Sequence, residues 1–114
     1  MSKLIDRATA HFEEVLAQGL KGPINVPEWD TDIYYRASST LAEEASVIDL
    51  QQQGKSTEAL CQTLINRAKD KDGNALFENS DRLKLMRRVD PKVILKIVTS
   101  MNPDEEAIEE TLGN

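Results

Sequence analysis

Apolar residues recur at every third or fourth position through the first twenty residues of the chain. This spacing predicts an amphipathic helix over Lys3–Leu20, because positions three and four apart lie on one face of a helix. Ser2 can cap the start of the helix, and Gly19 with Gly22-Pro23 favours its end. The expected apolar face consists of Leu4, Ile5, Ala8, Phe12, Val15, Leu16 and Gly19.

The pattern changes after this helix. Two short runs of β-branched and aromatic residues, Ile24–Val26 and Asp32–Arg36, flank Pro27-Glu28-Trp29-Asp30. Such runs are typical of strands, and the prolines on both sides of the first run exclude a central strand. We therefore expect a small β-hairpin, or a pair of edge strands, near residues 24–36.

Helical signals resume at Thr40-Leu41-Ala42-Glu43, which has the form of a capping box. In this motif the hydroxyl and the carboxylate each satisfy a backbone amide that the helix leaves unpaired. The predicted helix carries Leu41, Ala45 and Ile48 and ends before Gly54. A further helix is expected from Ser56, with one apolar face made of Leu60, Leu64, Ile65 and Ala68.

The second half of the chain contains three more local signals. Asp72-Gly73-Asn74 predicts a turn. Asn79 or Ser80 can then cap a short helix, whose apolar residues are Leu83, Met86 and Val89. Asp90-Pro91 has the form of an N-cap followed by a proline in the first helical position, and it predicts a helix that extends to about Met101.

The segment Val93–Val98 is apolar on more than one face, so its helix is either central in the fold or covered by a partner. Under the second interpretation Val93, Ile97 and Met101 are candidates for self-association. The predicted fold is mainly α with a small β-hairpin (α+β), with about five helices around one core. We expect a single domain over residues 1–102 and a short acidic C-terminal helix or tail over residues 103–114.

The composition narrows the classes of function. The length of 114 residues suits one domain, and 39% hydrophobic and 30% charged residues are ordinary for a globular protein. The net charge of −6 argues against nucleic acid as the main partner. Between Arg82 and Lys96, however, basic residues outnumber the single acid, and Arg87 and Arg88 are candidates for electrostatic docking of a copy or a partner.

Catalytic chemistry is poorly represented. His11 is the one histidine, and the one cysteine, Cys61, lies in a helical apolar pattern that favours a buried structural thiol. The segment from Asp70 to Asp81 resembles a calcium loop but lacks the glycine needed at its sixth position, so a turn is the favoured interpretation. We therefore expect no enzyme activity, no metal and no cofactor. A single cysteine also favours a reducing compartment, and no apolar run suggests a membrane span.

The order of several short motifs resembles one known family. An N-terminal helix is followed by motifs that occur in this sequence as Val26-Pro27-Glu28-Trp29, Ile33-Tyr34-Tyr35-Arg36, Glu43-Glu44, Lys71-Asp72-Gly73-Asn74-Ala75-Leu76-Phe77 and Asn79-Ser80-Asp81. This order is similar to that of the tail assembly chaperones of long-tailed, siphovirus-type bacteriophages. Each motif is weak by itself, and the resemblance covers roughly residues 20–102.

The resemblance implies a specific late function in the host cytoplasm. Such proteins bind the long, aggregation-prone tape measure protein without ATP, form homo-oligomers that are sometimes rings, and are absent from the finished virion. A programmed ribosomal frameshift adds a second domain that recruits the tail tube protein. On this basis the chain is expected to be the unshifted short product, with a slippery heptamer across codons 112–114, and sequencing of these codons tests this.

Trp29, Tyr34 and Arg36 match the family pattern and are candidate partner residues. Exposed aromatic and Arg side chains often anchor protein interfaces, although the favoured interpretation of Trp29 is that it fixes the hairpin to the helices. The alternative function is a generic helical adaptor or regulatory module. That module could bind DNA through the basic segment from Asp81 onward, which a helix-turn-helix protein would place in the major groove.

Overall fold

A computed structural model describes residues 3–101 of the chain. Its elements are α1 (Leu4–Leu16), β1 (Leu20–Val26), the 3-10 turn η1 (Pro27–Trp29), β2 (Thr31–Arg36), α2 (Leu41–Gln52), α3 (Ser56–Arg67), the 3-10 turn η2 (Asn79–Asp81), α4 (Arg82–Arg88) and α5 (Pro91–Met101). The predicted mainly helical fold with one small hairpin is confirmed. The expected acidic helix or tail at 103–114, like the cap expected at Ser2, lies outside the described residues.

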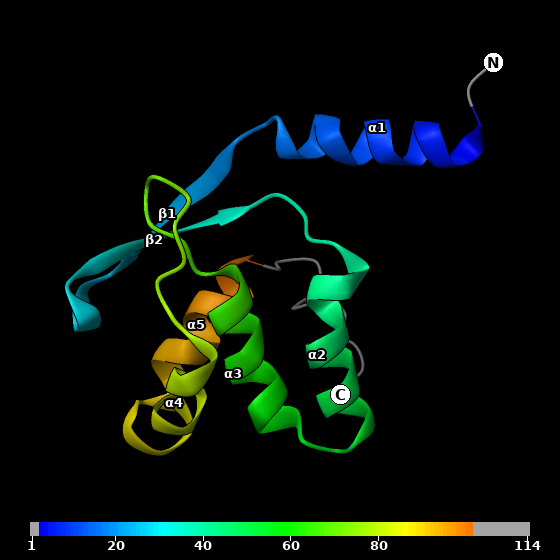
Figure 1. Ribbon diagram of the computed structural model, residues 1–114. Coiled ribbons are helices and arrows are strands. Elements are labelled where there is room, and N and C mark those ends of the chain that lie inside the picture. Colours follow the sequence, from blue (N-terminus) through cyan, green and yellow to red (C-terminus); the bar gives the residue numbers. More distant parts are fainter. Residues whose placement is uncertain (1–2, 102–114) are drawn as a thin grey trace, which may run out of the picture.

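The hairpin lies across one end of the helices α2 to α5 (Figure 1). Strands β1 and β2 are antiparallel, and their register is irregular between Lys21 and Ile24. Gly22 occupies this irregularity with φ +110°, and a Cβ there would approach the carbonyl oxygen of Ile33 to 2.9 Å. Only glycine fits such a position without displacing the backbone. Lys69 ties β2 to the segment after α3, since it exchanges two 2.8 Å backbone hydrogen bonds with Tyr34.

The main core lies between α3, α4, α5 and the hairpin. Its largest fully buried side chains are those of Val26, Ile33, Leu64 and Ile97. A smaller cluster of Val47, Leu50 and Ala59 joins α2 to α3. The stripe expected on α2 is wrong in part, because Leu41 is 76% exposed and Ala45 is exposed too. Helix α2 packs mainly against α3, so only one narrow side of it is covered.

Helix α5 is central. Five of its residues are buried, namely Val93, Ile94, Ile97, Val98 and Met101. The proposed self-association of α5 through Val93, Ile97 and Met101 is therefore corrected: the chain itself covers this surface. The N-cap signal is confirmed, since the Asp90 carboxylate accepts a 3.0 Å hydrogen bond from the backbone N–H of Lys92. None of the described helices is long and apolar enough to cross a membrane.

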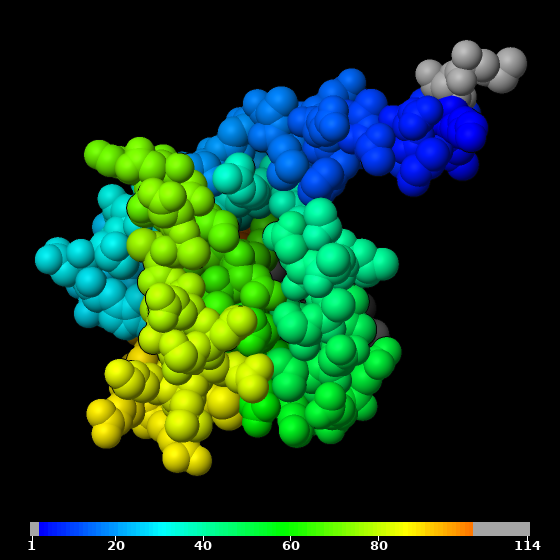
Figure 2. Space-filling model, in the orientation of Figure 1, coloured from blue at the N-terminus to red at the C-terminus, as the bar shows by residue number. Residues whose placement is uncertain are grey.

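Helix α1 differs from the other helices, because none of its residues is buried. It extends from the hairpin away from the rest of the molecule (Figures 1 and 2). The longest dimension of the structure is accordingly 53 Å, against 32 Å and 30 Å in the other two directions. The predicted amphipathic stripe is thus present on α1, but it does not line the core.

Candidate protein-binding surface

An apolar hollow of about 390 Å³ lies between the hairpin tip, the loop before η2, and α4. Figure 1 shows the hairpin tip and α4 on the same side of the molecule. The residues that line the hollow are Trp29, Thr31, Ile33, Leu76, Phe77, Leu85 and Val89, and we call it the tip groove. Of these seven side chains only Thr31 carries a hydroxyl group. The surface is therefore suited to contact with apolar groups, and it is poorly suited to binding a polar substrate.

The tip groove has a buried floor and a partly open rim. Ile33 and Leu85 form the floor, with 0% and 4% of their surfaces exposed. Trp29, Phe77 and Val89 are half-buried, and Leu76 is 38% exposed. Large apolar side chains that stay accessible around a concave floor are typical of surfaces where proteins bind.

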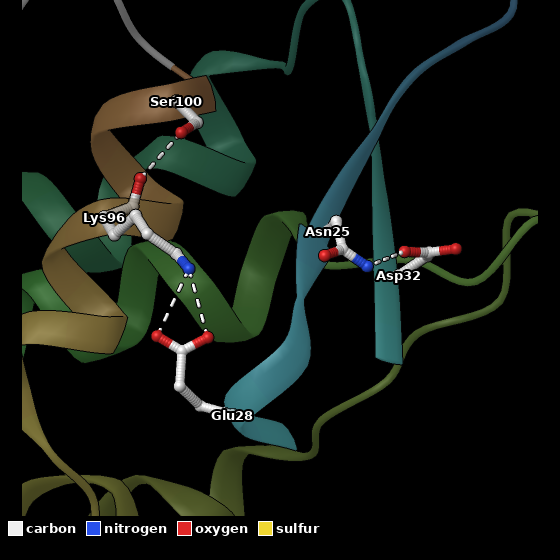
Figure 3. A network of polar contacts seen from close by, with 5 residues as sticks. All are labelled: Asn25, Glu28, Asp32, Lys96 and Ser100. Carbon is white, nitrogen blue, oxygen red and sulfur yellow. Dashed lines mark hydrogen bonds and ion pairs between the residues drawn. The ribbon is translucent and has the colours of Figure 1, made fainter. Parts of the chain in front are cut away.

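Aromatic packing and an ion pair position the hairpin side of the groove. The rings of Trp29 and Phe77 meet edge-to-face with centroids 6.2 Å apart. Beside them the Lys96 ammonium lies 3.1 Å and 3.3 Å from the two oxygens of Glu28, which joins the tip to α5 (Figure 3). The hydrogen bond from its own backbone amide, and then that from Lys96, lower the pKa of Glu28.

Helix α4 forms the side of the groove opposite to the hairpin, and a buried side-chain amide holds it in place. The sequence analysis did not predict this residue. Gln62 of α3 donates hydrogen bonds of 2.9 Å and 3.0 Å to Asn66 and Asn79, and its oxygen accepts one of 3.1 Å from Arg82. Only 4% of Gln62 is exposed. Because Asn79 and Arg82 belong to η2 and α4, this network holds α4, and with it Leu85, on α3.

The α4 side of the tip groove carries basic side chains. On α4, Lys84 and Arg88 are exposed and both lie to one side of the groove residue Leu85, by the geometry of the helix. On the hairpin, Asp32 lies between the groove residues Thr31 and Ile33 in the sequence, so its side chain points to the opposite face of β2. The Asp32 carboxylate also accepts a 2.9 Å hydrogen bond from Asn25 (Figure 3). A bound segment would therefore meet basic side chains on the α4 side of the groove.

The predicted site residues are not all brought together. Trp29 lies in the tip groove, and Arg88 stands at its rim. Arg87 lines a separate, more polar hollow of about 280 Å³ with Arg82 and Leu83. Tyr34 and Arg36 lie further along β2 than the groove residues Thr31 and Ile33; Arg36 pairs with Leu20 at the end of the hairpin opposite to Trp29.

The remaining groove residues were not predicted as a site. Leu76 and Phe77 are adjacent apolar residues in a loop, and this was the one signal in the sequence that could have found them. Cys61 is buried as expected, and burial raises the pKa of its thiol. Among residues 3–101 the structure groups no three His, Cys, Asp or Glu side chains that could hold a metal ion.

Comparison of the chain with family models, with curated protein sequences and with solved structures finds no match.

Proposed function

We propose that this protein is a tail assembly chaperone of a long-tailed bacteriophage, which acts in the host cytoplasm and holds apolar segments of the tape measure protein in the tip groove. The observation that carries the proposal is the groove itself, a hollow with Trp29, Phe77 and Val89 accessible at its rim. A holdase needs such a surface and needs no catalytic group. The order of the sequence motifs supports the choice of this family.

The groove suggests the kind of segment that is bound. A helix that presents a stripe of Leu, Ile or Phe can cover an apolar hollow and leave its polar sides to the rim. Lys84 and Arg88 favour acidic residues along one side of that helix. The apolar lining gives no support to the DNA-binding alternative. A generic protein-binding adaptor could use the same surface, and only the order of the sequence motifs favours the chaperone over it.

Co-expression with the tape measure protein of the same phage tests the proposal. The parent chain should keep the tape measure protein in the supernatant and should be captured with it. Leu76→Glu should abolish both effects, because it places a charge in the apolar groove. Leu41→Glu is the matched control, since Leu41 is also exposed but lies on α2. Equal loss in both variants, or capture by Leu76→Glu, would reject the groove as the client site.

A further inference from the structure

The sequence that follows α5 is strongly acidic. Between Asp104 and Glu110 five of the seven residues are acids, and residues 102–114 contain no basic residue. Ile108 and Leu112 add two apolar side chains four positions apart. Residues 104–112, which we call the acidic segment, thus combine acidic and apolar groups. These are the two features that the tip groove and its α4 side favour in a bound segment.

Most basic side chains of α4 and of the first turn of α5 have no acidic partner within residues 3–101. Arg82 is hydrogen-bonded to Gln62, and Lys96 pairs with Glu28. The exposed basic residues that form no ion pair with any described residue are Lys84, Arg87, Arg88 and Lys92. Two of these four, Lys84 and Arg88, stand beside the groove residue Leu85. An acidic segment is therefore attracted to this side of the groove.

The length of the chain after α5 allows the acidic segment to reach the groove of its own molecule. Lys96 binds Glu28 beside the groove residue Trp29, so α5 passes the hairpin tip at this point. Met101 lies five residues further, about 7.5 Å along the helix axis. Residues 102–112 span up to roughly 36 Å when fully extended. The two shorter dimensions of the whole structure are 32 Å and 30 Å, so this length suffices for the return.

We propose that the acidic segment lies in the tip groove of its own chain when no client is bound, with its carboxylates toward Lys84 and Arg88, and that the client displaces it. This inference rests on the proposed function only for the identity of the client. The free chaperone thereby covers its apolar hollow without closing it to a client.

The tether makes even a weak contact effective. Because the acidic segment is joined to α5, its effective concentration at the groove is on the order of millimolar. A contact with a Kd of about 0.1 mM would then cover roughly 90% of the grooves and weaken the apparent affinity for a client about tenfold.

The fluorescence of Trp29 reports on the groove, because Trp29 lines it and is the only tryptophan of the chain. Quenching by acrylamide therefore measures how far the groove is open to solvent. The test compares the full-length parent with a full-length neutral variant. This variant carries the substitutions Asp104→Asn, Glu105→Gln, Glu106→Gln, Glu109→Gln and Glu110→Gln.

At low salt the quenching constant of the neutral variant should exceed that of the parent about twofold, because the tethered segment covers most grooves of the parent. At about 1 M salt the difference should vanish, since the Debye length is then only about 3 Å. The control variant that combines Glu13→Gln with Glu14→Gln removes exposed acids of α1 and should be quenched as the parent is.

A second variant approaches the contact from the groove. The combination of Lys84→Glu with Arg88→Glu should raise the quenching constant as the neutral variant does. Its matched control combines Lys21→Glu with Lys55→Glu, since these lysines are also exposed but lie outside the groove. This control should leave the quenching constant at the parental value.

Three results would overturn the proposal. The first is equal quenching of the parent and the neutral variant at low salt. The second is a difference that appears only as the protein concentration rises, because the acidic segment of a second copy would then be the occupant. The third is a difference that persists undiminished at high salt, which would exclude the contact between opposite charges.

Capture of the tape measure protein separates this inference from the proposed function. At low salt the neutral variant should bind it about tenfold more tightly than the parent does. Equal binding despite different quenching would reject the competition. If the two proteins are quenched alike while Leu76→Glu still loses the tape measure protein, the proposed function stands and this inference fails. If the neutral variant is quenched more strongly but no variant captures the tape measure protein, the covered groove stands and the proposed function fails.

Discussion

The rings of Trp29 and Phe77 meet at an interplanar angle of 77°, so that the hairpin tip and the loop before η2 form one aromatic wall. Forty-eight positions separate these residues in the sequence. Each ring is half-buried in the fold, and the rest of its surface is accessible to solvent or to a binding partner. The same contact therefore stabilises the fold and shapes the surface that we assign to binding.

Replacement of Trp29 by Ala should both destabilise the protein and impair client binding. Because the indole is only half-buried, the loss should fall below the ~3–5 kcal/mol that removal of a fully buried Trp or Phe side chain costs. Urea unfolding measures this loss, and capture of the tape measure protein measures the second effect. Trp29→Phe should retain most of both properties, and a Trp29→Ala variant with parental stability and parental capture would contradict this role.

Gln62→Ala should lower the free energy of unfolding by about 2 kcal/mol, because it leaves Asn79 and Arg82 without their buried partner. It should also loosen α4 and so weaken binding at the groove. Gln52→Ala, at an exposed position near the end of α2, should change neither property. Similar unfolding midpoints for the two variants would show that the network does not support α4.

Two isoleucine-to-glutamate changes should separate the core from the surface. Ile97→Glu buries a carboxylate at a position with 0% exposure and should unfold the domain, with a loss above about 4 kcal/mol. Ile5→Glu changes an exposed position of α1 and should leave the unfolding transition of residues 20–101 unaltered. Circular dichroism melts of both variants provide the comparison, and a folded Ile97→Glu protein would refute the central position of α5.

Asp70 should contribute stability that disappears in acid. Its carboxylate accepts hydrogen bonds of 3.0 Å and 2.8 Å from the backbone N–H groups of Asn74 and Asp72, and the Asn74 amide is the largest cause that lowers its pKa from 3.8. A pKa lowered on folding stabilises the native state above the unfolded value, and that stability is lost as the pH falls through the folded value.

Asp70→Asn should therefore reduce stability at pH 7, and its difference from the parent should shrink as the pH falls below 3.8. Carboxyl chemical shifts followed by NMR should place the titration midpoint of Asp70 below 3.8 in the parent. A midpoint at or above this value would remove the basis of the prediction.

Local signals in the sequence were sufficient for most of the elements. Thr40 and Glu43 form the expected capping box, in which the Thr40 hydroxyl accepts a 3.1 Å hydrogen bond from the backbone N–H of Glu43. Gly73 adopts φ +86° in the expected turn. Such motifs depend on residues within four positions of one another, and for that reason they can be recognised without the fold.

The tip groove could not be predicted in the same way. Trp29, Phe77 and Val89 come together only when three distant segments of the chain pack. No spacing in the sequence predicts that these segments lie side by side. The apolar excess on α5 was evident, but its cause was not: a central helix and an interface helix have the same pattern until burial is known. The apolar stripe of α1 has the same periodicity as the stripe of a core helix, so the pattern could not show that this stripe is exposed.

Crosslinking that locates the tape measure protein on this chain tests the proposed role of the tip groove most directly. A photo-crosslinking amino acid in place of Leu76, activated during co-expression with the tape measure protein, should join the two chains. The same amino acid in place of Leu41 should give no such product, because Leu41 lies on α2 outside the groove. Crosslinking from Leu41 but not from Leu76 would contradict the assignment of the tip groove as the client-binding surface.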